Sequence, residues 1–495
     1  MFRYLKEIFN RLLKEDEPKL QPTDIEKIKE MMNKGELEKA LKNIEDVIEG
    51  TKNTDVRLDA AIVKSDILNL MGKFHESLKI AEKTLVESLS LKKNKQALDA
   101  IIAIVDQLFR LGENDRGLEL VKQGEEQIKK SKDEFSSKEL LQREFFLKNR
   151  EAAFYSAKGN RFLAYKLLKK NLKRAKKLEG KERLARALNN LGLISFYIGK
   201  LDEAEKSLLE GIQIYDEMNE QASVGYTLNN ISMVYLFRGE LDTAETYLNK
   251  SLKIARNLGN DMAISFALVS LGHINKIRGK YQNSFKNYLE SYNLREGIGN
   301  DKNTSESVFY LIDLALKMEQ LDKAQKYYQK LNEINERTDN RLVDQRERVA
   351  NALLLQNESR TRDKIKAQTI LNEVVEEVVA DNELTVFAML RLFESLLYEL
   401  RTSEDEEILE ELNDLSEKLI NIAEKSGSSP MMAEIFMLQA KLSLLELNTE
   451  EAKQKIEKAL ETAKEKNLKS LIETITQEKK LLDEQVSTWN ELADR

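Results

Sequence analysis

The sequence contains no cysteine, and only three prolines, two histidines and one tryptophan occur among its 495 residues. Without cysteine the chain can form neither disulfides nor thiolate metal sites, and its two histidines, His75 and His273, have no zinc-binding spacing. We therefore expect no metal and no cofactor. Three prolines and 19 glycines are too few for the frequent turns of a β protein, so the composition predicts an all-α fold.

Long apolar runs are missing as well. None approaches the roughly 18 residues that span a bilayer, and the N-terminus lacks the features of a signal peptide. Together with the lack of cysteine, this predicts a cytoplasmic protein. The phosphate-binding pattern GxxxxGK and the nucleophile pattern GxSxG are also missing, and the many carboxylates form no recognisable acid and base pair. We expect no enzyme activity.

The chain does contain an internal repeat of 40 residues. Gly159, Gly199, Gly239 and Gly279 keep this interval, and apolar residues at helical spacing flank each of them. The pattern predicts a hairpin of two helices in each unit, with a small residue where the two helices cross. Three further registers keep the interval: Ala164, Ala204, Ala244, Ser284 and Ala324; Leu168, Leu208, Leu248, Tyr288 and Tyr328; and Leu191, Ile231, Leu271 and Leu311.

Extended along the chain, the repeat predicts a right-handed α-solenoid of about eleven stacked hairpins. Helix C-termini capped in left-handed geometry are expected at Asn219-Glu220, Gly259-Asn260, Gly299-Asn300 and Asp339-Asn340. Five segments follow: an amphipathic N-terminal helix and linker (1–22), divergent hairpins (23–140), the regular array (141–340), further divergent hairpins (341–467) and a C-terminal capping helix (468–495).

Two consecutive units carry the same pattern of small and large residues: Leu188, Leu191-Gly192, Ala204, Leu208 and Gly211, then Leu228, Ile231-Ser232, Tyr235, Ala244, Leu248 and Ser251. This pattern resembles the tetratricopeptide repeat family in its 40-residue form. The tandem Leu-Asn-Asn motifs at 188–190 and 228–230 are similar to those of kinesin light chains and bacterial peptide-sensing regulators. The family's tryptophan and terminal proline are missing from these units. The resemblance implies a protein-interaction scaffold or adaptor that binds a partner peptide in a concave groove lined by first helices.

Asparagines recur along this expected groove. Asn149, Asn189 and Asn229 share one register, and Asn190 and Asn230 share the next. An asparagine amide can pair with both polar groups of an extended peptide backbone. In related arrays matching asparagines bind peptides, so the resemblance assigns this role first to Asn190 and Asn230. The alternative is that these amides lie on a solvated face or bond the neighbouring hairpin. The full expected peptide-binding set is Asn149, Asn189, Asn190, Asn229, Asn230, Arg150, Arg186, Tyr226, Phe266 and His273.

Charge is distributed unevenly. Residues 158–186 hold twelve basic and two acidic residues, a net charge of +10, whereas residues 372–417 hold two basic and fifteen acidic residues, a net charge of −13. The basic stretch could be a solvated face, a contact for an acidic partner or a nucleic-acid site. Its few aromatic residues argue against binding of single-stranded nucleic acid.

Residues 1–14 form an amphipathic segment with an apolar stripe and an excess of basic residues. The segment could touch an anionic membrane weakly, dock in a groove or cap the first hairpin. The main expectation is therefore a scaffold that binds a protein or peptide. The alternatives are a peptide-responsive regulator and a peripheral membrane organiser. The sequence specifies neither the partner nor an oligomeric state.

Overall fold

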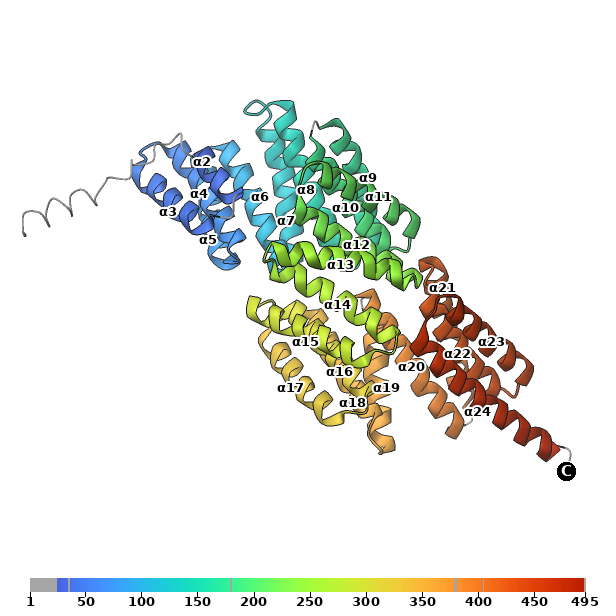
Figure 1. The fold of residues 1–495 in the computed structure, drawn as a ribbon. Coiled ribbons are helices and arrows are strands. Elements are labelled where there is room, and N and C mark those ends of the chain that lie inside the picture. The colour runs from blue at the N-terminus through green and yellow to red at the C-terminus, as the bar shows by residue number, and fades with distance from the viewer. Residues whose placement is uncertain (1–24, 34–35, 179, 378–380, 404, 494–495) are drawn as a thin grey trace, which may run out of the picture. The chain divides into compact units, whose positions relative to one another are not determined.

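The computed structural model describes residues 25–33, 36–178, 180–377, 381–403 and 405–493. Within these ranges every regular element is an α-helix, and 23 helices make eleven hairpins followed by one closing helix (Figure 1). The predicted all-α solenoid of about eleven hairpins is confirmed. The expected helix within residues 1–22 lies outside the described residues.

Each hairpin pairs an even-numbered first helix with an odd-numbered second helix, and α24 (Lys469–Ala493) follows the last hairpin. The first helices are α2 (Ile25–Asn33), α4 (Thr54–Leu70), α6 (Asn94–Leu111), α8 (Ser137–Ala157), α10 (Lys181–Tyr197), α12 (Gln221–Arg238), α14 (Asp261–Ile277), α16 (Asp301–Lys317), α18 (Arg341–Gln356), α20 (Asn382–Ser403) and α22 (Ser429–Leu445). The second helices are α3 (Leu37–Gly50), α5 (Phe74–Ser90), α7 (Asn114–Lys130), α9 (Arg161–Lys177), α11 (Leu201–Glu217), α13 (Leu241–Asn257), α15 (Tyr281–Ile298), α17 (Leu321–Arg337), α19 (Thr361–Glu376), α21 (Glu406–Ser426) and α23 (Thr449–Glu465).

Contacts divide the chain into two compact units. The first unit comprises the residues up to 157 together with 166–179, and the second comprises 158–165 together with 180–495. Helix α9 therefore contributes residues to both units. The five segments expected from the sequence remain a prediction.

In the first unit, successive helices bury apolar faces against one another. The ring of Phe154 on α8 lies directly over Gly117 on α7, where any Cβ atom would collide with it. Gly124, about two turns further along α7, lies against Leu147 in the same way. Both aromatic and aliphatic side chains are buried here, so glycine on α7 allows α8 to approach closely.

The hairpins of the second unit cross where the sequence places small residues. Ala204 and Ala244 are fully buried, and so is Leu208. A Cβ atom at Gly192 on α10 would lie 2.6 Å from Cγ of Leu208 and 3.2 Å from the carbonyl oxygen of Ala204 on α11. Because the backbones meet this closely, the register needs glycine or a small residue on one helix and a single large residue on the other.

The turns between helices follow the glycine register. Gly199, Gly239 and Gly279 have φ angles of 78°, 79° and 71°, and Glu319 adopts the same left-handed geometry at the next step with φ 58°. The left-handed caps expected between units are confirmed at Asn219, Gly259 and Gly299, whose φ angles are 57°, 60° and 75°.

The corresponding prediction for Asp339-Asn340 is wrong. Helix α17 ends at Thr338 in extended geometry, and Asn340 has φ −135°. Its side chain instead accepts hydrogen bonds from the N–H groups of Leu342 and Val343 at the start of α18. This asparagine is an N-cap, a position that favours the same short polar side chains as a left-handed cap.

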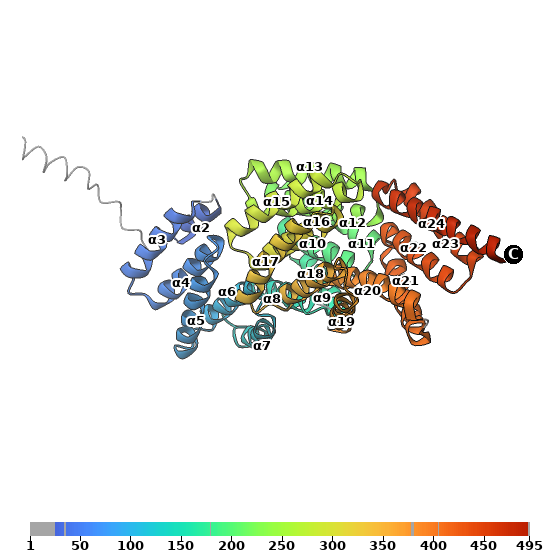
Figure 2. The same ribbon diagram turned by 90° about the horizontal axis from the view of Figure 1, so that it is seen from below.

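The C-terminal hairpins return to pack against the start of the second unit. Gly199, in the turn between α10 and α11, touches the carbonyl group of Lys425 at the end of α21, and Gly239 in the next hairpin lies against Lys466. Helix α12 contacts α22, and α14 contacts α24. Figures 1 and 2 show α22 and α24 beside the ends of the α12 to α14 helices.

This return buries the first residue of successive second helices. Leu201 and Leu241 are 7% and 6% exposed and belong to one hydrophobic cluster with Leu468 and Ile475 of the C-terminal region. Leu321 holds the same register two repeats after Leu241 and is 45% exposed. The C-terminal hairpins therefore cover the first residues of α11 and α13 but not that of α17.

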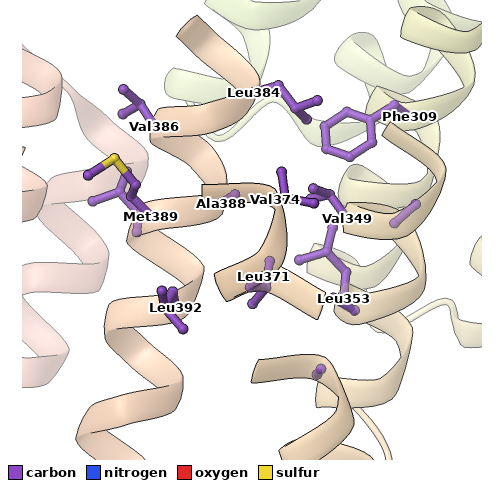
Figure 3. Packing of buried hydrophobic residues seen from close by; sticks show 14 of the residues in the cluster. Phe309, Val349, Leu353, Leu371, Val374, Leu384, Val386, Ala388, Met389 and Leu392 are labelled. Atoms are coloured by element: carbon purple, nitrogen blue, oxygen red, sulfur yellow. The ribbon is translucent and has the colours of Figure 1, made fainter. Parts of the chain in front are cut away.

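A second large cluster joins helices α14 to α22. Figure 3 shows Phe309 and Leu384 pointing toward one another, with Val349 and Leu371 in the adjoining layer. The cluster fixes the N-terminal half of α20 against α16 and α18. It thereby positions the residues described in the next section.

We predict that Leu241→Ala lowers the free energy of unfolding by about 2–4 kcal/mol, because it leaves a cavity under the returning helices. Leu321→Ala is the matched control and should change it by less than about 0.5 kcal/mol. Thermal unfolding of both variants followed by circular dichroism measures the difference. Equal destabilisation would contradict the proposed edge contact.

Glu319→Gly should stabilise the protein by about 0.5–1 kcal/mol. The substitution removes a left-handed backbone strain of about 1–2 kcal/mol, and the entropy cost of ordering glycine offsets only part of this gain. Lys326→Gly, on an exposed helical position of α17, is the control and should destabilise by about 1 kcal/mol. The thermal midpoints of the two variants should move in opposite directions. A lower midpoint for Glu319→Gly would mean that the glutamate side chain has a stabilising contact.

Candidate functional site

A cavity of about 90 Å³ lies in the second unit between four consecutive first helices, α14, α16, α18 and α20. This volume holds several water molecules or one polar side chain. Because first helices line it, the cavity occupies the side of the solenoid on which the sequence predicts a binding groove. Its lining residues are His273, Lys276, Phe309, Tyr310, Asp313, Arg346, Asp381, Glu383, Leu384 and Phe387.

Aromatic rings form one wall of the cavity. The Tyr310 ring stacks on Tyr288 with centroids 5.3 Å apart and meets the His273 ring edge-on at 4.5 Å. Phe309 contacts Phe387 in a T-shaped arrangement at 5.5 Å. These rings belong to α14, α15, α16 and α20, so the wall depends on the packing of several hairpins.

Glycine in the repeat makes this wall feasible. The fully buried Tyr288 replaces the leucine of the preceding repeats, and its ring lies directly over Gly272, where a Cβ atom would collide with it. The Tyr288 hydroxyl lies 2.8 Å from Nδ1 of His273. This hydrogen bond fixes the orientation of the His273 imidazole.

Most charged groups around the cavity are paired. Lys276 forms an ion pair with Asp313, and Glu306 pairs with Arg295 at 2.7 Å and with Arg346 at 3.3 Å. Arg295 is fully buried and joins its own hairpin to the next one, since it also contacts Ser265 on α14 and the carbonyl oxygen of Asn303 on α16. The trio of Arg295, Glu306 and Arg346 therefore links α15, α16 and α18 electrostatically.

Two carboxylates at the start of α20 differ from this pattern. Asp381 accepts the N–H of Glu383 at 2.8 Å and so caps the helix. Glu383 lines the cavity and accepts a hydrogen bond from the Tyr310 hydroxyl at 3.3 Å. In the part of the chain that the structure describes, neither carboxylate forms an ion pair.

The enclosure changes protonation equilibria. Loss of hydration raises the pKa of the Glu383 carboxyl to about 7, and the negative charges of Asp381 and Glu306 add to the shift. Burial lowers the pKa of His273 to about 4, and the charge of Lys276 contributes. At neutral pH the imidazole is uncharged, whereas Glu383 is divided between its two forms.

The end of α10 lies within electrostatic range of this site. Burial raises the pKa of Tyr197 to about 12, and the charge of Asp381 contributes to the shift. The Arg161 guanidinium lies 4.8 Å from the centre of the Tyr197 ring. The electrostatic influence of Asp381 thus extends to α10, beyond the four helices that line the cavity.

Of the ten residues predicted to bind peptide, only His273 lines the cavity. Asn230 donates a hydrogen bond of 3.0 Å to the side-chain oxygen of Asn189, so these two amides link neighbouring hairpins. Asn190 is partly exposed. The side-chain oxygens of Asn149 and Asn229 are shielded from solvent and have no protein hydrogen-bond partner.

The remaining predicted residues lie elsewhere. Arg150, in the first unit, forms an ion pair with Asp106, and Arg186 pairs with Glu182 at 2.6 Å on the exposed face of α10. The Tyr226 hydroxyl is hydrogen-bonded to Asn260. The Arg295 guanidinium covers the Phe266 ring at 5.1 Å.

Two of the missed residues continue a 40-residue register that holds three of the predicted residues. Arg186, Tyr226 and Phe266 are each 40 residues apart, and the next two steps are Glu306 and Arg346. Asp313 likewise lies 40 residues after His273. Extending these registers would have found all three. Asp381 and Glu383 have no such signal, because the interval from α18 to α20 is 41 residues and the repeat pattern fades there.

The basic stretch is largely accessible. Lys166, Lys170, Lys173, Lys176 and Lys177 are exposed on α9. Arg174 pairs with Glu144, and Lys181 pairs with Glu217. An acidic partner for this stretch remains a prediction. Among the described helices, none combines the length and apolar character needed to cross a bilayer.

Comparison with known proteins supports the repeat assignment. Residues 145–217 and 223–297 match the tetratricopeptide repeat family model. These two segments are tetratricopeptide repeats. The tetratricopeptide resemblance seen in the sequence is thus confirmed. We find no significant match among curated protein sequences.

Solved tetratricopeptide structures share the fold. NprR in complex with its cognate peptide NprX is 15% identical with a TM-score of 0.51, and the match covers 75% of this chain and 99% of that one. The apo form of the quorum sensor NprR from B. thuringiensis is 14% identical with a TM-score of 0.50 and coverage of 71% and 99%. At this identity the likeness establishes the fold.

His273 provides a direct test of the cavity's low polarity. In a His75→Gln variant, the single remaining imidazole should give an NMR titration midpoint near pH 4, because burial disfavours the charged ring. The unfolded chain binds this proton near pH 6.5, whereas the folded chain binds it near pH 4. Protonation therefore favours the unfolded chain, and the free energy of unfolding falls as pH decreases from about 6.5 to 4. A midpoint near 6.5 would show that water fills the site.

Proposed function

We propose that this protein is a protein-interaction scaffold that holds a peptide segment of a partner against the first helices of its second unit. The observation that carries the proposal is the cavity between α14 and α20, where aromatic rings and two carboxylates without ion pairs meet. Sites of this kind combine an apolar wall with a few oriented polar groups. The tetratricopeptide repeats and the NprR structure solved with a peptide support the same class of ligand.

The groove from α10 to α20 offers contacts for both parts of a peptide. We infer that Tyr310 and Phe387 hold a side chain, while Asn190 and Asn230 pair with the peptide backbone. In the second unit, Asn189, Asn229, Arg186, Tyr226, Phe266 and His273 remain proposed contacts. Asn149 and Arg150 lie in the first unit, and their peptide contacts remain a separate prediction. A mobile peptide loses conformational entropy on binding, so we expect an affinity of about 1 µM.

A second candidate is a peptide-responsive regulator. The packing of the C-terminal hairpins on α10 to α14 favours it, because a peptide bound between them could alter that contact. Small-angle scattering with and without bound peptide distinguishes the two functions: compaction supports the regulator, and an unchanged radius supports the static scaffold. The membrane organiser rests on residues 1–14, outside the described residues, and liposome flotation with and without that segment tests it.

The proposed site predicts a specific loss of binding. Fluorescence polarisation with labelled hexapeptide pools should give saturable binding to the full chain. Tyr310→Ala combined with Phe387→Ala should weaken the best pool at least about tenfold, because it removes two aromatic side chains that line the cavity. Tyr398→Ala, an exposed tyrosine further along α20, is the control and should leave the affinity unchanged. Equal binding by the double variant would place the ligand elsewhere.

The asparagines are tested separately. Asn190→Ala combined with Asn230→Ala should weaken peptide binding by about tenfold if both amides hold the backbone. The thermal midpoint should fall only slightly, because the one hydrogen bond lost, from Asn230 to Asn189, contributes about 0.5–1.5 kcal/mol. An unchanged affinity with a lower midpoint would show that the asparagines serve hairpin packing alone.

A further inference from the structure

We propose that the cavity between α14 and α20 is a subsite for one basic side chain, lysine or arginine, of the bound peptide, with Asp381 and Glu383 as its anionic partners. The inference rests on the proposed function and adds the chemical class of the ligand.

The charge around the cavity supports a cationic occupant. Lys276 and Asp313 neutralise each other, and Arg346 donates to Glu306, to the Ser305 hydroxyl and to a backbone carbonyl. Lys276 and Arg346, the two cationic residues that line the cavity, are therefore committed to protein partners. Of the cavity-lining carboxylates in the described residues, Asp381 and Glu383 alone lack an ion pair.

Glu383 is also oriented for a ligand. Its Oε1 accepts the Tyr310 hydroxyl, and Tyr310 is itself held by Tyr288 and His273. A carboxylate fixed in this way keeps its remaining lone pairs for an incoming donor. An ammonium or guanidinium group would find charge-assisted hydrogen bonds there and an aromatic wall beside it.

The cavity is large enough for one side chain but too small for a whole peptide. A cavity of about 90 Å³ admits a guanidinium or ammonium group and its neighbouring methylene groups. The peptide backbone would remain outside, along the groove toward α10. The subsite is therefore a specificity pocket for one position of the peptide.

The ionisation of Glu383 agrees with this assignment. Its pKa of about 7 reflects lost hydration and the nearby charges of Asp381 and Glu306, which the Tyr310 hydrogen bond and the charge of Arg346 offset only in part. A bound cation would stabilise the ionised form, so binding should release protons near pH 7 and strengthen as pH rises from 6 to 8. The charged or titratable groups facing Glu383 are His273 and Lys276 on α14, Lys302, Glu306, Tyr310 and Asp313 on α16, Arg346 on α18, Asp381 before α20 and Tyr197 on α10.

The test uses the full chain and fluorescein-labelled hexapeptide pools that are random except for one fixed residue: arginine, lysine, citrulline, norleucine or glutamate. Citrulline has nearly the shape of arginine without its charge. We expect the arginine and lysine pools to bind at least about tenfold more tightly than the citrulline pool. Calorimetry of the arginine pool in two buffers at pH 7 should show proton release.

Variants locate the preference. Glu383→Gln combined with Asp381→Asn should abolish the advantage of arginine over citrulline and leave citrulline binding intact. Glu410→Gln, on the exposed face of α21, is the matched control and should keep the advantage. Glu383→Lys should move the preference toward the glutamate pool, a gain of binding that misfolding cannot produce.

The outcomes separate this inference from the proposed function. If no pool binds, the peptide-binding function itself is wrong. If pools bind without preference for arginine or lysine, or prefer glutamate in the unaltered protein, peptide binding stands and the basic subsite is overturned. Retention of the arginine preference by the Glu383→Gln and Asp381→Asn double variant would also overturn it.

Discussion

The fold depends on the close approach of two helix backbones within each hairpin. At Gly192 the facing helix brings Leu208 and the carbonyl group of Ala204 so near that a side chain would not fit. The 40-residue repeat preserves this contact by keeping small residues at one position and large residues at another. Because each crossing is fixed, the first helix of every hairpin presents the same face, and residues 40 positions apart in sequence become neighbours.

The candidate site uses this regularity and departs from it. Tyr288 replaces a leucine at the crossing and packs over Gly272, which brings its hydroxyl to His273. One register then changes from Tyr226 and Phe266 to Glu306 and Arg346, and the fully buried Arg295 joins the two charged residues across hairpins. A repetitive scaffold has thus acquired a local polar site through a few substitutions at equivalent positions.

Much of the fold could be predicted because the repeat is local. Glycine spacing gave the turns, and helical spacing gave the hairpins, including the left-handed geometry at Asn219. The same logic failed at Asn340, since a short polar residue suits an N-cap as well as a left-handed C-cap. Sequence alone does not distinguish these two roles.

The site was less predictable because it depends on contacts between repeats. The Asn189 and Asn230 side chains bond to each other across two hairpins, and the period alone leaves both this contact and peptide binding open. Glu306 and Asp313 lie on recognisable registers, but Asp381 and Glu383 follow a 41-residue step from α18 to α20 that breaks the 40-residue period.

The returning C-terminal hairpins have a consequence for biosynthesis. Solenoids usually assemble from contacts between adjacent modules, which lets each hairpin settle as it leaves the ribosome. Here Leu201 contacts Gly427, which is synthesised more than two hundred residues later. The apolar side chains at this edge therefore remain exposed to solvent until synthesis is almost finished. A nascent or truncated chain would display a row of leucines that chaperones recognise, and closure of that edge would be the final folding step.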